Sequence, residues 1–519
     1  MPPNETLTGA RTIWELVVRR ADATPDHPML IDADDEILTF GAFRHRVERV
    51  AAGLAAIGIG PGSVVSWQLP TRIDTVVLSI ALSRLGAVQN PIIHLYRERE
   101  VGFAVRQTGA SHLFIPRTWR DIDFVAIAEG ALADASPRPE ILVIDDGLPE
   151  GDPASLPPAP EGAAPDEAPI RWIYYTSGST ADPKGVQHTD QTLIAGGWGL
   201  AKALQMSPDD VGSIAFPFAH IAGPDYLVTM LSLGFPAVLV DTFSAPAVLP
   251  LFRRHGVTMV GGSTAFYVAY LAEQRKDPST PILPTLRLMS GGGAAKPPEI
   301  HYEVREEIGG RGVVHGYGMT EVPMIAQGSP TDTDEQLAHT DGKPVEGAEV
   351  RVVTLDGRVA GPDEEGEVRV RGPMVFHGYT DPALTVDAFD QDGFFRTGDL
   401  GVLRADGHVA LTGRLKDVIV RKGENISAKE IEDLLYTHPK VIEVAVVGIP
   451  DASRGEMVCA VVQLGEGSEP LDLAEVVAFC RQAGLMTQKI PERVEIRTEW
   501  PRAGTGKILK KALRDEYAG

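Results

Sequence analysis

The sequence predicts an α/β protein with more than one domain. Its 519 residues are long for a single hydrophobic core. Up to about residue 340, apolar helical patterns alternate with short apolar strands, and glycines end the helices. This order of elements is typical of an α/β fold. Beyond that point the pattern changes to short alternating strands, and a compact α+β unit follows the segment 413–417. We therefore expect one domain over residues 1–413 and a smaller one over residues 414–519.

The large domain repeats the order helix, glycine stop and strand several times. Helices are predicted where apolar residues recur at helical spacing, at 12–23, 40–57, 74–85, 97–108, 190–204, 245–255, 263–274 and 299–308. Strands are predicted at short apolar runs, at 29–32, 37–40, 63–69, 87–93, 111–116, 172–175, 211–216, 237–241, 258–261 and 286–289. Residues 146–170 are rich in proline and acidic residues, so we expect an exposed, mobile connection there.

The last third of the chain has the shorter strands. They are predicted at 348–354, 367–371, 402–403 and 409–411, with Asp399 on a turn between them. In the C-terminal unit we expect strands at 418–421, 441–449, 457–464 and 493–496 and helices at 427–436 and 472–484.

Composition excludes several classes of function. The formal charge of −23 argues against nucleic acid or an anionic membrane surface as a partner, and it means that an anionic substrate needs a local basic patch. Cys459 and Cys480 are too few for a disulfide framework or a thiolate metal site. No run reaches membrane-spanning length and the first 30 residues lack the apolar core of a signal peptide, so we expect a cytoplasmic protein without stable membrane insertion.

A candidate phosphate loop follows the buried strand Trp172–Tyr175. It reads Thr-Ser-Gly-Ser-Thr-Ala-Asp-Pro-Lys-Gly from Thr176 to Gly185. Small residues let backbone N–H groups approach a polyphosphate, hydroxyls add donors, and Lys184 supplies a mobile positive charge. The order differs from the Walker loop, whose Gly-Lys-Ser/Thr ending opens a helix, because Lys184 stands between proline and glycine and favours a loop. An ordinary surface turn has a similar composition.

Four further segments carry candidate site residues. A glycine-rich turn, 290–295, follows a predicted strand, which is where open α/β sheets bind ligands. Tyr317–Glu321 offers an aromatic ring, a hydroxyl and a carboxylate, suited to a base, a phosphate and a hard metal ion. His220 and Lys507 lie in loops, and from their residue type alone each could be an ordinary solvated or loop side chain.

Five segments, in order along the chain, resemble the adenylate-forming superfamily of acyl-CoA synthetases, firefly luciferase and nonribosomal adenylation domains. They are 176–185, 317–321, 396–399, 413–417 and 506–507. The resemblance implies a large N-terminal domain of two α/β subdomains plus a β-barrel-like portion, with a small α+β lid. It also implies two half-reactions: a carboxylate attacks the α-phosphorus of ATP to give an acyl-adenylate and pyrophosphate, and a thiol then takes the acyl group.

The resemblance also implies roles for individual residues around ATP and Mg²⁺. Residues Thr176, Ser177, Gly178, Ser179, Thr180 and Lys184 would hold the β- and γ-phosphates, and Gly293, Ala294, Ala295, Tyr317 and Gly318 would flank the adenine. Thr320 would contact the α-phosphate and Glu321 would bind Mg²⁺. Asp399 would bind the ribose hydroxyls, Arg414 the ribose or a phosphate, and Lys507 the carboxylate and α-phosphate during adenylation. Lys416 would be the hinge of the lid, and the loop with Gly423 and Glu424 would line the path of CoA.

For the acid, the resemblance implies a pocket of His220, Ile221, Gly223, Phe266, Gly291 and Gly292. A branched apolar side chain at Ile221 cannot neutralise an ammonium group, so amino acids are poor candidates. We expect a hydrophobic acid, such as a fatty, alicyclic, terpenoid or steroid side-chain acid, because the N-terminal half looks most like bacterial ligases for such acids.

Three alternatives stay open. The chain could load a carrier protein instead of CoA. Because Ala181 replaces the family's usual glycine, it could also keep only one half-reaction. As for partners, it could form a homodimer. A nucleotide-binding sensor is the non-enzymatic alternative, although a pure binder would not need the terminal lysine.

Overall fold

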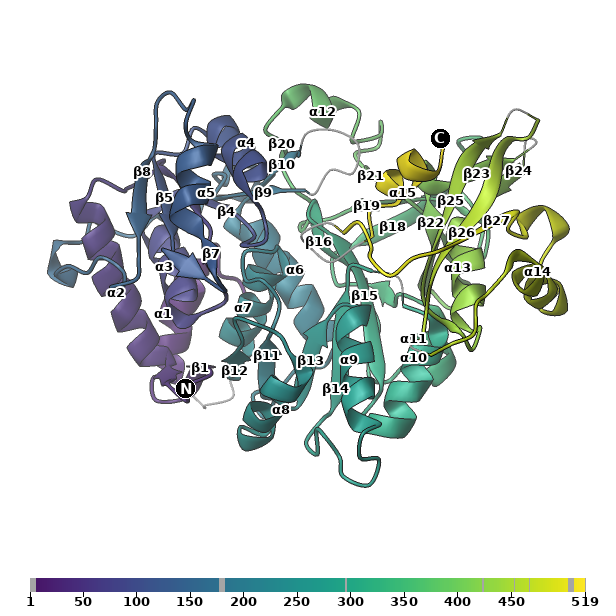
Figure 1. Ribbon diagram of the computed structural model, residues 1–519. Helices are drawn as coiled ribbons and strands as arrows, with labels where there is room; N and C mark the ends of the chain where they lie inside the picture. The colour runs from purple at the N-terminus through teal and green to yellow at the C-terminus, as the bar shows by residue number, and fades with distance from the viewer. Residues whose placement is uncertain are drawn as a thin grey trace.

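The structure is a computed structural model that describes residues 6–176, 183–294, 296–421, 424–451, 453–465, 467–502 and 508–518. The fold is mixed α/β, with a large N-terminal part and a smaller C-terminal one. Figure 1 shows the N-terminal helices and their sheet on the left, a second α/β layer in the middle and the C-terminal unit on the right. None of the helices in these ranges is long and apolar enough to cross a membrane.

The first unit is built on a seven-stranded sheet in the order β20-β10-β9-β4-β3-β5-β8. Its strands are β3 (Val64–Trp67), β4 (Val88–Pro91), β5 (His112–Ile115), β8 (Glu140–Val143), β9 (Trp172–Tyr175), β10 (Gly185–His188) and β20 (Gly378–Tyr379). The helices around it are α1 (Ile13–Ala23), α2 (Phe40–Ala56), α3 (Ile73–Leu85), α4 (Glu98–Thr108) and α5 (Phe124–Ala131). Helix α3 is apolar on nearly every side and is therefore buried along its whole length.

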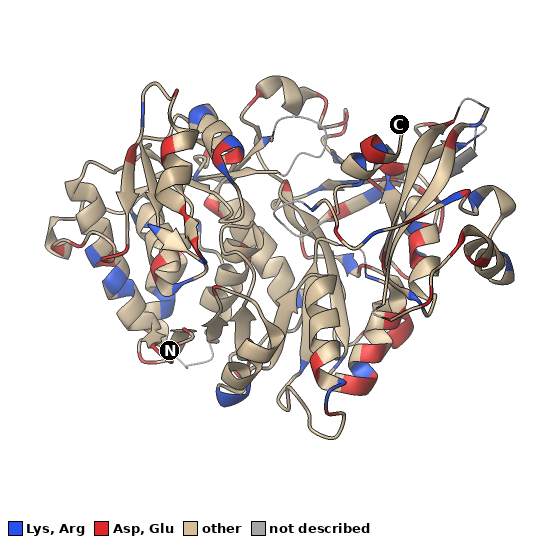
Figure 2. Ribbon diagram, in the orientation of Figure 1, with Lys and Arg blue, Asp and Glu red and all other residues tan. Residues whose placement is uncertain are grey.

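Two further sheets form the middle of the molecule. One has the order β11-β12-β1-β2, from β1 (Pro28–Ile31), β2 (Ile37–Thr39), β11 (Gly212–Ile214) and β12 (Ala237–Leu239). The other has the order β13-β14-β15-β16-β17, from β13 (Met259–Gly262), β14 (Leu288–Gly292), β15 (Val313–Met319), β16 (Val322–Gln327) and β17 (Lys343–Pro344). Their helices are α6 (Asp190–Ala203), α7 (Ala222–Leu233), α8 (Ala245–Arg254), α9 (Thr264–Gln274), α10 (Pro298–Glu303) and α11 (Asp334–His339). Figure 2 shows acidic residues gathered on α10 and the helical turn that follows it.

The barrel-like portion is a four-stranded antiparallel sheet. It contains β18 (Glu349–Val353), β19 (Gly366–Arg371), β21 (Phe395–Leu403) and β22 (Val409–Arg414), with the short helix α12 (Pro382–Val386) beside β20.

The C-terminal unit follows a single turn at Leu415–Asp417. Its sheet has the order β24-β23-β26-β25, with β27 on the far side of β26. The elements are β23 (Ile419–Arg421), β24 (Glu424–Ile426), β25 (Val441–Asp451), β26 (Gly455–Leu464), β27 (Arg493–Ile496), α13 (Ala428–Tyr436), α14 (Leu473–Gln482) and α15 (Lys510–Tyr517).

Most predicted elements are present within a few residues of their predicted bounds. The capped helix after Thr39 is confirmed, because the Thr39 hydroxyl accepts from the Ala42 amide. The sequence analysis missed helices α5, α7, α11, α12 and α15 and several strands, among them β8 and β16. Asp399 lies within strand β21, where it pairs with Arg414, so the predicted turn at that carboxylate is wrong.

The proline-rich segment 146–170 is largely exposed but is also tethered to the first unit. The Gly151 amide donates to the Arg49 carbonyl at 2.9 Å, and the Arg84 guanidinium donates to the Pro157 carbonyl at 2.8 Å. Leu156 and Ala159 pack against the core of that unit. The segment is therefore an exposed connection that is fixed along the surface of the first unit.

Helix α1 is held by two buried polar contacts. The Ile13 amide donates to the Asp190 carboxylate at 3.0 Å, and the Trp172 indole donates to the other oxygen of the same carboxylate at 2.8 Å. Arg20, fully buried, donates to the carbonyls of Leu231 and Ser232 at the end of α7. The start of the chain is thus bound both to the strand that precedes the candidate phosphate loop and to α7.

Candidate functional site

The first half of the site joins Tyr317, Asp399 and Arg414. Tyr317 lies on β15, and its hydroxyl donates to the Asp399 carboxylate at 2.8 Å. The Arg414 guanidinium approaches the other oxygen of that carboxylate at 2.9 Å, because the two residues face each other on β21 and β22. Burial, together with the negative charge of Asp399, raises the pKa of Tyr317 well above its ordinary value, so the phenol stays a hydrogen-bond donor.

Local backbone geometry aims Asp399 at this point. Gly398 has a φ of +70°, a conformation that favours glycine, and the ladder between β21 and β22 shifts register at Leu400 and Gly401. The Asp399 amide also donates to the Thr397 hydroxyl at 3.0 Å. The result is a buried carboxylate that two side chains contact, on a residue whose backbone is also fixed by a hydrogen bond.

The second half of the site joins Glu321, Tyr379 and Lys184. Glu321 lies in the turn between β15 and β16, and its carboxylate accepts from the Tyr379 hydroxyl at 2.8 Å. The Lys184 amine lies 4.8 Å from the centroid of the Tyr379 ring, a cation–π distance. Burial raises the pKa of Glu321, and the Tyr379 hydrogen bond and the Lys184 charge oppose that rise.

A Mg²⁺ ion would fit at Glu321 as a partner shared with phosphate. Carboxylate oxygen is a ligand that Mg²⁺ prefers, and Mg²⁺ is usually bound by one or two carboxylates together with substrate phosphates. Within the described residues, no group of three or more His, Cys, Asp or Glu side chains could hold a metal ion. The Glu321 carboxylate therefore suits an ion that arrives with a polyphosphate.

The ends of the candidate phosphate loop are fastened to each other. The Thr176 amide donates to the Lys184 carbonyl at 3.1 Å, and the Lys184 amide donates to the Thr176 hydroxyl at 3.4 Å. Gly185 then opens β10, which runs antiparallel to β9, so the loop spans a hairpin. The predicted site residues Ser177, Gly178, Ser179 and Thr180 lie outside the described residues, as does Ala181.

His188 is a site-supporting residue that the sequence analysis missed. Its Nε2 donates to the Thr320 carbonyl at 2.7 Å, and its Nδ1 accepts from the Thr192 hydroxyl at 2.8 Å. Burial lowers the pKa of His188 to about 4, which keeps the ring neutral with its proton on Nε2. The available signal was a histidine at the end of the strand that follows the phosphate loop.

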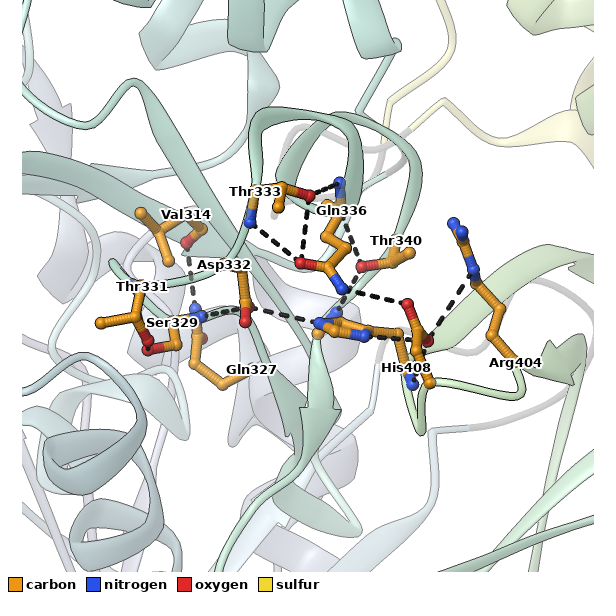
Figure 3. A network of polar contacts seen from close by, with 12 residues as sticks. Val314, Gln327, Ser329, Thr331, Asp332, Thr333, Gln336, Thr340, Arg404 and His408 are labelled. Carbon is orange, nitrogen blue, oxygen red and sulfur yellow. Dashed lines mark hydrogen bonds and ion pairs between the residues drawn. The ribbon is translucent and has the colours of Figure 1, made fainter.

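A buried polar network connects the two sheets that carry these residues (Figure 3). His408, at the start of β22, lies between the carboxylates of Asp406 and Asp332, at 3.0 Å and 3.4 Å. Gln336 on α11 donates to Asp406 at 3.0 Å. Because Asp332 follows β16 and His408 precedes Arg414, the network fixes the hairpin with Glu321 relative to the strands with Asp399.

The predicted acid pocket includes glycines at the carboxyl ends of parallel strands. Gly291 on β14 pairs with Gly262 on β13 and with His315 on β15, and Gly292 pairs with Gly316. A Cβ atom at Gly291 would lie 1.7 Å from the Gly262 carbonyl oxygen, and one at Gly292 would lie 2.5 Å from the Gly316 carbonyl oxygen. Only glycine fits at either position.

The other residues of the predicted acid pocket come from α9 and the start of α7. Phe266 on α9 lies over Gly262 and stacks on Phe243 with ring centroids 4.0 Å apart. Ile221 is buried at the start of α7, and a Cβ at Gly223 would lie 2.1 Å from the Phe218 carbonyl oxygen. His220 precedes them and accepts from the Ala222 amide at 3.3 Å.

The remaining predicted residues are placed as follows. Gly293 has a φ of +77° after β14 and is followed by Ala294, while Ala295 lies outside the described residues. Gly318 lies on β15, where a Cβ would meet the Pro323 carbonyl oxygen at 2.1 Å. Lys416 is in the turn after β22, and burial, followed by the charge of Arg414, lowers its pKa. Glu424 begins β24, whereas Gly423 and Lys507 lie outside the described residues.

Fold and site define an adenylate-forming enzyme. The AMP-binding enzyme family matches residues 17–380, and the AMP-binding enzyme C-terminal domain matches residues 430–507. The chain belongs to this family and is an ATP-dependent adenylate-forming ligase.

Named relatives agree with that assignment. The chain is 31% identical to a medium-chain fatty-acid–CoA ligase of Escherichia coli, over 98% of this chain and 91% of the relative. It is 33% identical to a sulfoacetate–CoA ligase of Cupriavidus necator, over 97% of each. Among solved structures, ATP-bound MatB from Rhodopseudomonas palustris superposes with a TM-score of 0.86 at 28% identity, over 97% of this chain and 99% of that one. The o-succinylbenzoate CoA synthetase from Bacillus subtilis, with its acyl-adenylate, gives 0.83 at 28% identity, over 98% and 99%.

Proposed function

We propose that the protein is an acid–CoA ligase, which activates a hydrophobic carboxylic acid with ATP and transfers the acyl group to CoA. The observation that carries the proposal is the β15–β16 hairpin. It presents Tyr317 toward Asp399 and Glu321 toward Tyr379, so one short element aligns both halves of a nucleotide site. Relatives named as CoA ligases cover nearly the whole chain, which supports the choice of CoA as acceptor.

In the first half-reaction ATP would lie along this hairpin. Asp399 would accept from the ribose hydroxyls, Tyr317 and the segment 293–295 would enclose the adenine, and Arg414 would stay near the ribose. Lys184 and the loop 176–180 would hold the outer phosphates. Glu321 would bind Mg²⁺, which neutralises charge on the phosphates when bound. An oxygen of the acid would attack the α-phosphorus, and pyrophosphate would leave.

Two lid residues would act in turn around the adenylate. Lys507 would place its charge where negative charge builds on the nonbridging oxygens, a position in which a preorganised cation stabilises most. A rotation near Lys416 would then withdraw Lys507 and bring the loop with Gly423 and Glu424 toward the thiol path. The thiol sulfur would attack the acyl carbonyl, and AMP would leave. Because this rotation would occur near Lys416, we place the domain boundary between residues 413 and 414.

The acid pocket favours an uncharged, apolar substrate. The glycine backbone, Phe266, Phe243 and Ile221 offer apolar surface and carry no charge of their own. An ammonium group would find no counter-charge among these side chains, which argues against α-amino acids. A medium-chain fatty acid or an alicyclic acid fits this chemistry.

A test would incubate the protein with ATP, Mg²⁺ and a panel of fatty, alicyclic, aryl and amino acids, with and without CoA. Mass spectrometry would follow acyl-adenylate and acyl-CoA. The proposal expects acyl-CoA from apolar acids only. A preference for amino acids, or adenylate that never becomes thioester with CoA, would refute it.

A carrier protein is the second candidate acceptor. One relative, 31% identical over 97% of this chain, is named as a salicyl-AMP ligase and salicyl-S-ArCP synthetase of Mycobacterium tuberculosis. Transfer of the acyl group to a pantetheinylated carrier protein, with no transfer to CoA, would select this candidate.

A further inference from the structure

Backbone contacts join the two stretches of the C-terminal chain that flank residues 503–507. Arg502 and Ile508 form an antiparallel β-bridge, and the Leu509 amide donates to the Pro501 carbonyl at 2.7 Å. We call Pro501, Arg502, Ile508 and Leu509 the neck. Lys507 is bonded directly to Ile508, and consecutive Cα atoms are about 3.8 Å apart, so the position of the neck limits where Lys507 can act.

The first half of the neck is fixed to the sheet of the C-terminal unit. The Arg502 guanidinium donates to the Glu443 carboxylate at 2.5 Å, and the Trp500 indole donates to the Gln463 side chain at 2.7 Å. Glu443 and Gln463 face each other on β25 and β26, so both contacts are made with one place in that sheet. These contacts hold the chain just before residue 503.

The second half of the neck leads into α15, and an ion pair holds the first residue of that helix. The Lys510 amine lies 2.6 Å from Oε1 of Glu432 on α13, and the same oxygen accepts from the Val446 amide of β25 at 2.6 Å. Glu432 is buried, whereas Glu430 on the same helix is exposed. Burial raises the pKa of Glu432, and the Lys510 charge is the largest influence that opposes this rise. A buried carboxylate without such a partner would be costly.

Helix α15 itself does not account for a lysine at this position. A cation in the first turn of a helix opposes the helix dipole, and Leu509, at the N-cap, makes no side-chain hydrogen bond to the helix. Lys510 and Leu513 are three residues apart and so lie on one face of α15. Leu513 is fully buried in one core with Ala445 and Val447 of β25. Leu513 thus fixes the body of the helix, and the pair with Glu432 fixes the end from which the chain leads back to Lys507.

We infer that Glu432 and Lys510 are positioning residues for adenylation, which hold the neck so that Lys507 reaches the α-phosphate. This inference rests on the proposed function, which takes Lys507 as the cation of that step. A charge that is placed before the reaction stabilises a transition state most, and a misplacement of about 1 Å can lower a rate about 10²-fold. The contacts that hold the neck lie within the C-terminal unit, so they would persist when that unit turns near Lys416.

The main variants of the test are Glu432→Gln and Lys510→Met. Glutamine keeps an oxygen for the Val446 amide but removes the charge, and methionine keeps an apolar stem but removes the amine. Acid-dependent exchange between ATP and pyrophosphate would measure adenylation. We expect its maximal rate to fall about tenfold in each variant while the KM for ATP stays constant. Thioester formation from supplied acyl-adenylate and CoA should stay within about twofold.

Three further variants separate positioning from a general loss of structure. The double variant Glu432→Gln, Lys510→Met should lose no more than either single variant, because the two side chains form one contact. In a Lys507→Ala background, Glu432→Gln should cause no further loss of adenylation, since it acts through Lys507. Lys510→Arg keeps a charge within reach of Glu432 and should retain most of the rate.

Lys511→Met is the matched control. It removes an exposed amine from the next residue, which pairs with Asp515 of the same helix at 3.7 Å, and it should change neither half-reaction. Unchanged exchange in both single variants, an equal loss in both half-reactions, or a further loss in the Lys507→Ala background would overturn the inference.

Two points keep these outcomes distinct. Lys510 is the more exposed partner of the pair, so Lys510→Met carries the test if Glu432→Gln does not fold. Full adenylation by the Lys507→Ala variant would refute the proposed role of Lys507, and absence of acyl-adenylate from the unmodified protein with every acid would refute the proposed function.

Discussion

The proposed nucleotide side and the proposed acyl side of the site are built in opposite ways. On the nucleotide side, charged and hydroxyl side chains from distant elements hold one another, as in the bonds from Tyr317 to Asp399 and from Tyr379 to Glu321. On the acyl side, backbone approaches backbone at Gly291 and Gly292, and Phe266 packs on Gly262. On the first side, hydrogen bonds fix the positions of charged groups that would bind ATP. On the second side, packing sets the shape of the acid pocket, and a change in one side chain can alter that shape.

The largest effect should come from the lid lysine. Lys507→Ala removes the cation that would stabilise the transition state of adenylation, so we expect adenylation to fall by about 10² to 10³-fold. Thioester formation from supplied acyl-adenylate should change far less. The rates of the two half-reactions would be measured separately. An equal loss of rate in both would contradict the assignment of Lys507 to the adenylation step.

Asp399→Asn tests the buried carboxylate of the nucleotide side. The change leaves Arg414 without its charged partner and weakens the ribose contact, so kcat/KM for ATP should fall about 10 to 100-fold. The KM for the acid should stay within twofold, because the acyl side does not use this group. Steady-state kinetics with each substrate varied would check both values. Asp356→Asn, an exposed carboxylate in the same four-stranded unit, is the control.

Phe266→Ala tests the shape of the acyl side. Removing the ring above Gly262 should open space and shift the preference toward a longer or bulkier acid by about tenfold, while the KM for ATP stays constant. Val268→Ala on the same helix removes an exposed side chain and should shift nothing. If the KM for ATP changed as much as the acid preference, the two sides would not be separable.

A separate prediction concerns stability and not activity, and it rests on two buried histidines. Burial lowers the pKa of His188, under the nucleotide side, to about 4 and that of His315, on β15, to about 3. A histidine whose folded pKa is depressed gives stability that is present above its unfolded pKa of about 6.5 and is lost as pH falls toward the folded value. Between pH 6.5 and 4 each should therefore remove up to about 3 kcal/mol of unfolding free energy.

Urea unfolding at pH 7.5 and 5.0 would measure this loss. His188→Asn should make the protein less sensitive to acid, although less stable at pH 7.5 because the bond to Thr320 weakens. His45→Gln replaces an exposed histidine and should keep the original pH dependence. An unchanged slope in the His188 variant would contradict the assignment.

The sequence predicted the two sides unequally for a physical reason. Tyr317, Glu321, Asp399 and Arg414 carry recognisable chemistry, so their segments were found, although the strand position of Asp399 depends on a bulge that no residue pattern marks. Gly291 and Phe266 were expected in a pocket. The volume of that pocket depends on how α9 packs on two strands, and a sequence pattern does not determine this packing. His188 was missed because burial, and not its neighbours in sequence, makes it a neutral donor.

The bond from the Ile13 amide to Asp190 has a practical consequence for engineering the chain. The described residues before Thr12 add to this anchor, because Leu7 and Ala10 are buried in the same core and the Leu7 amide donates to the Ser232 carbonyl at 2.9 Å. Deletion of α1 would remove one hydrogen-bond donor to Asp190. It would also remove Arg20, which donates to the Leu231 and Ser232 carbonyls. Because Asp190 also accepts from the Trp172 indole, the strand before the candidate phosphate loop would lose part of its support. Shortened versions of this enzyme should therefore begin no later than Leu7.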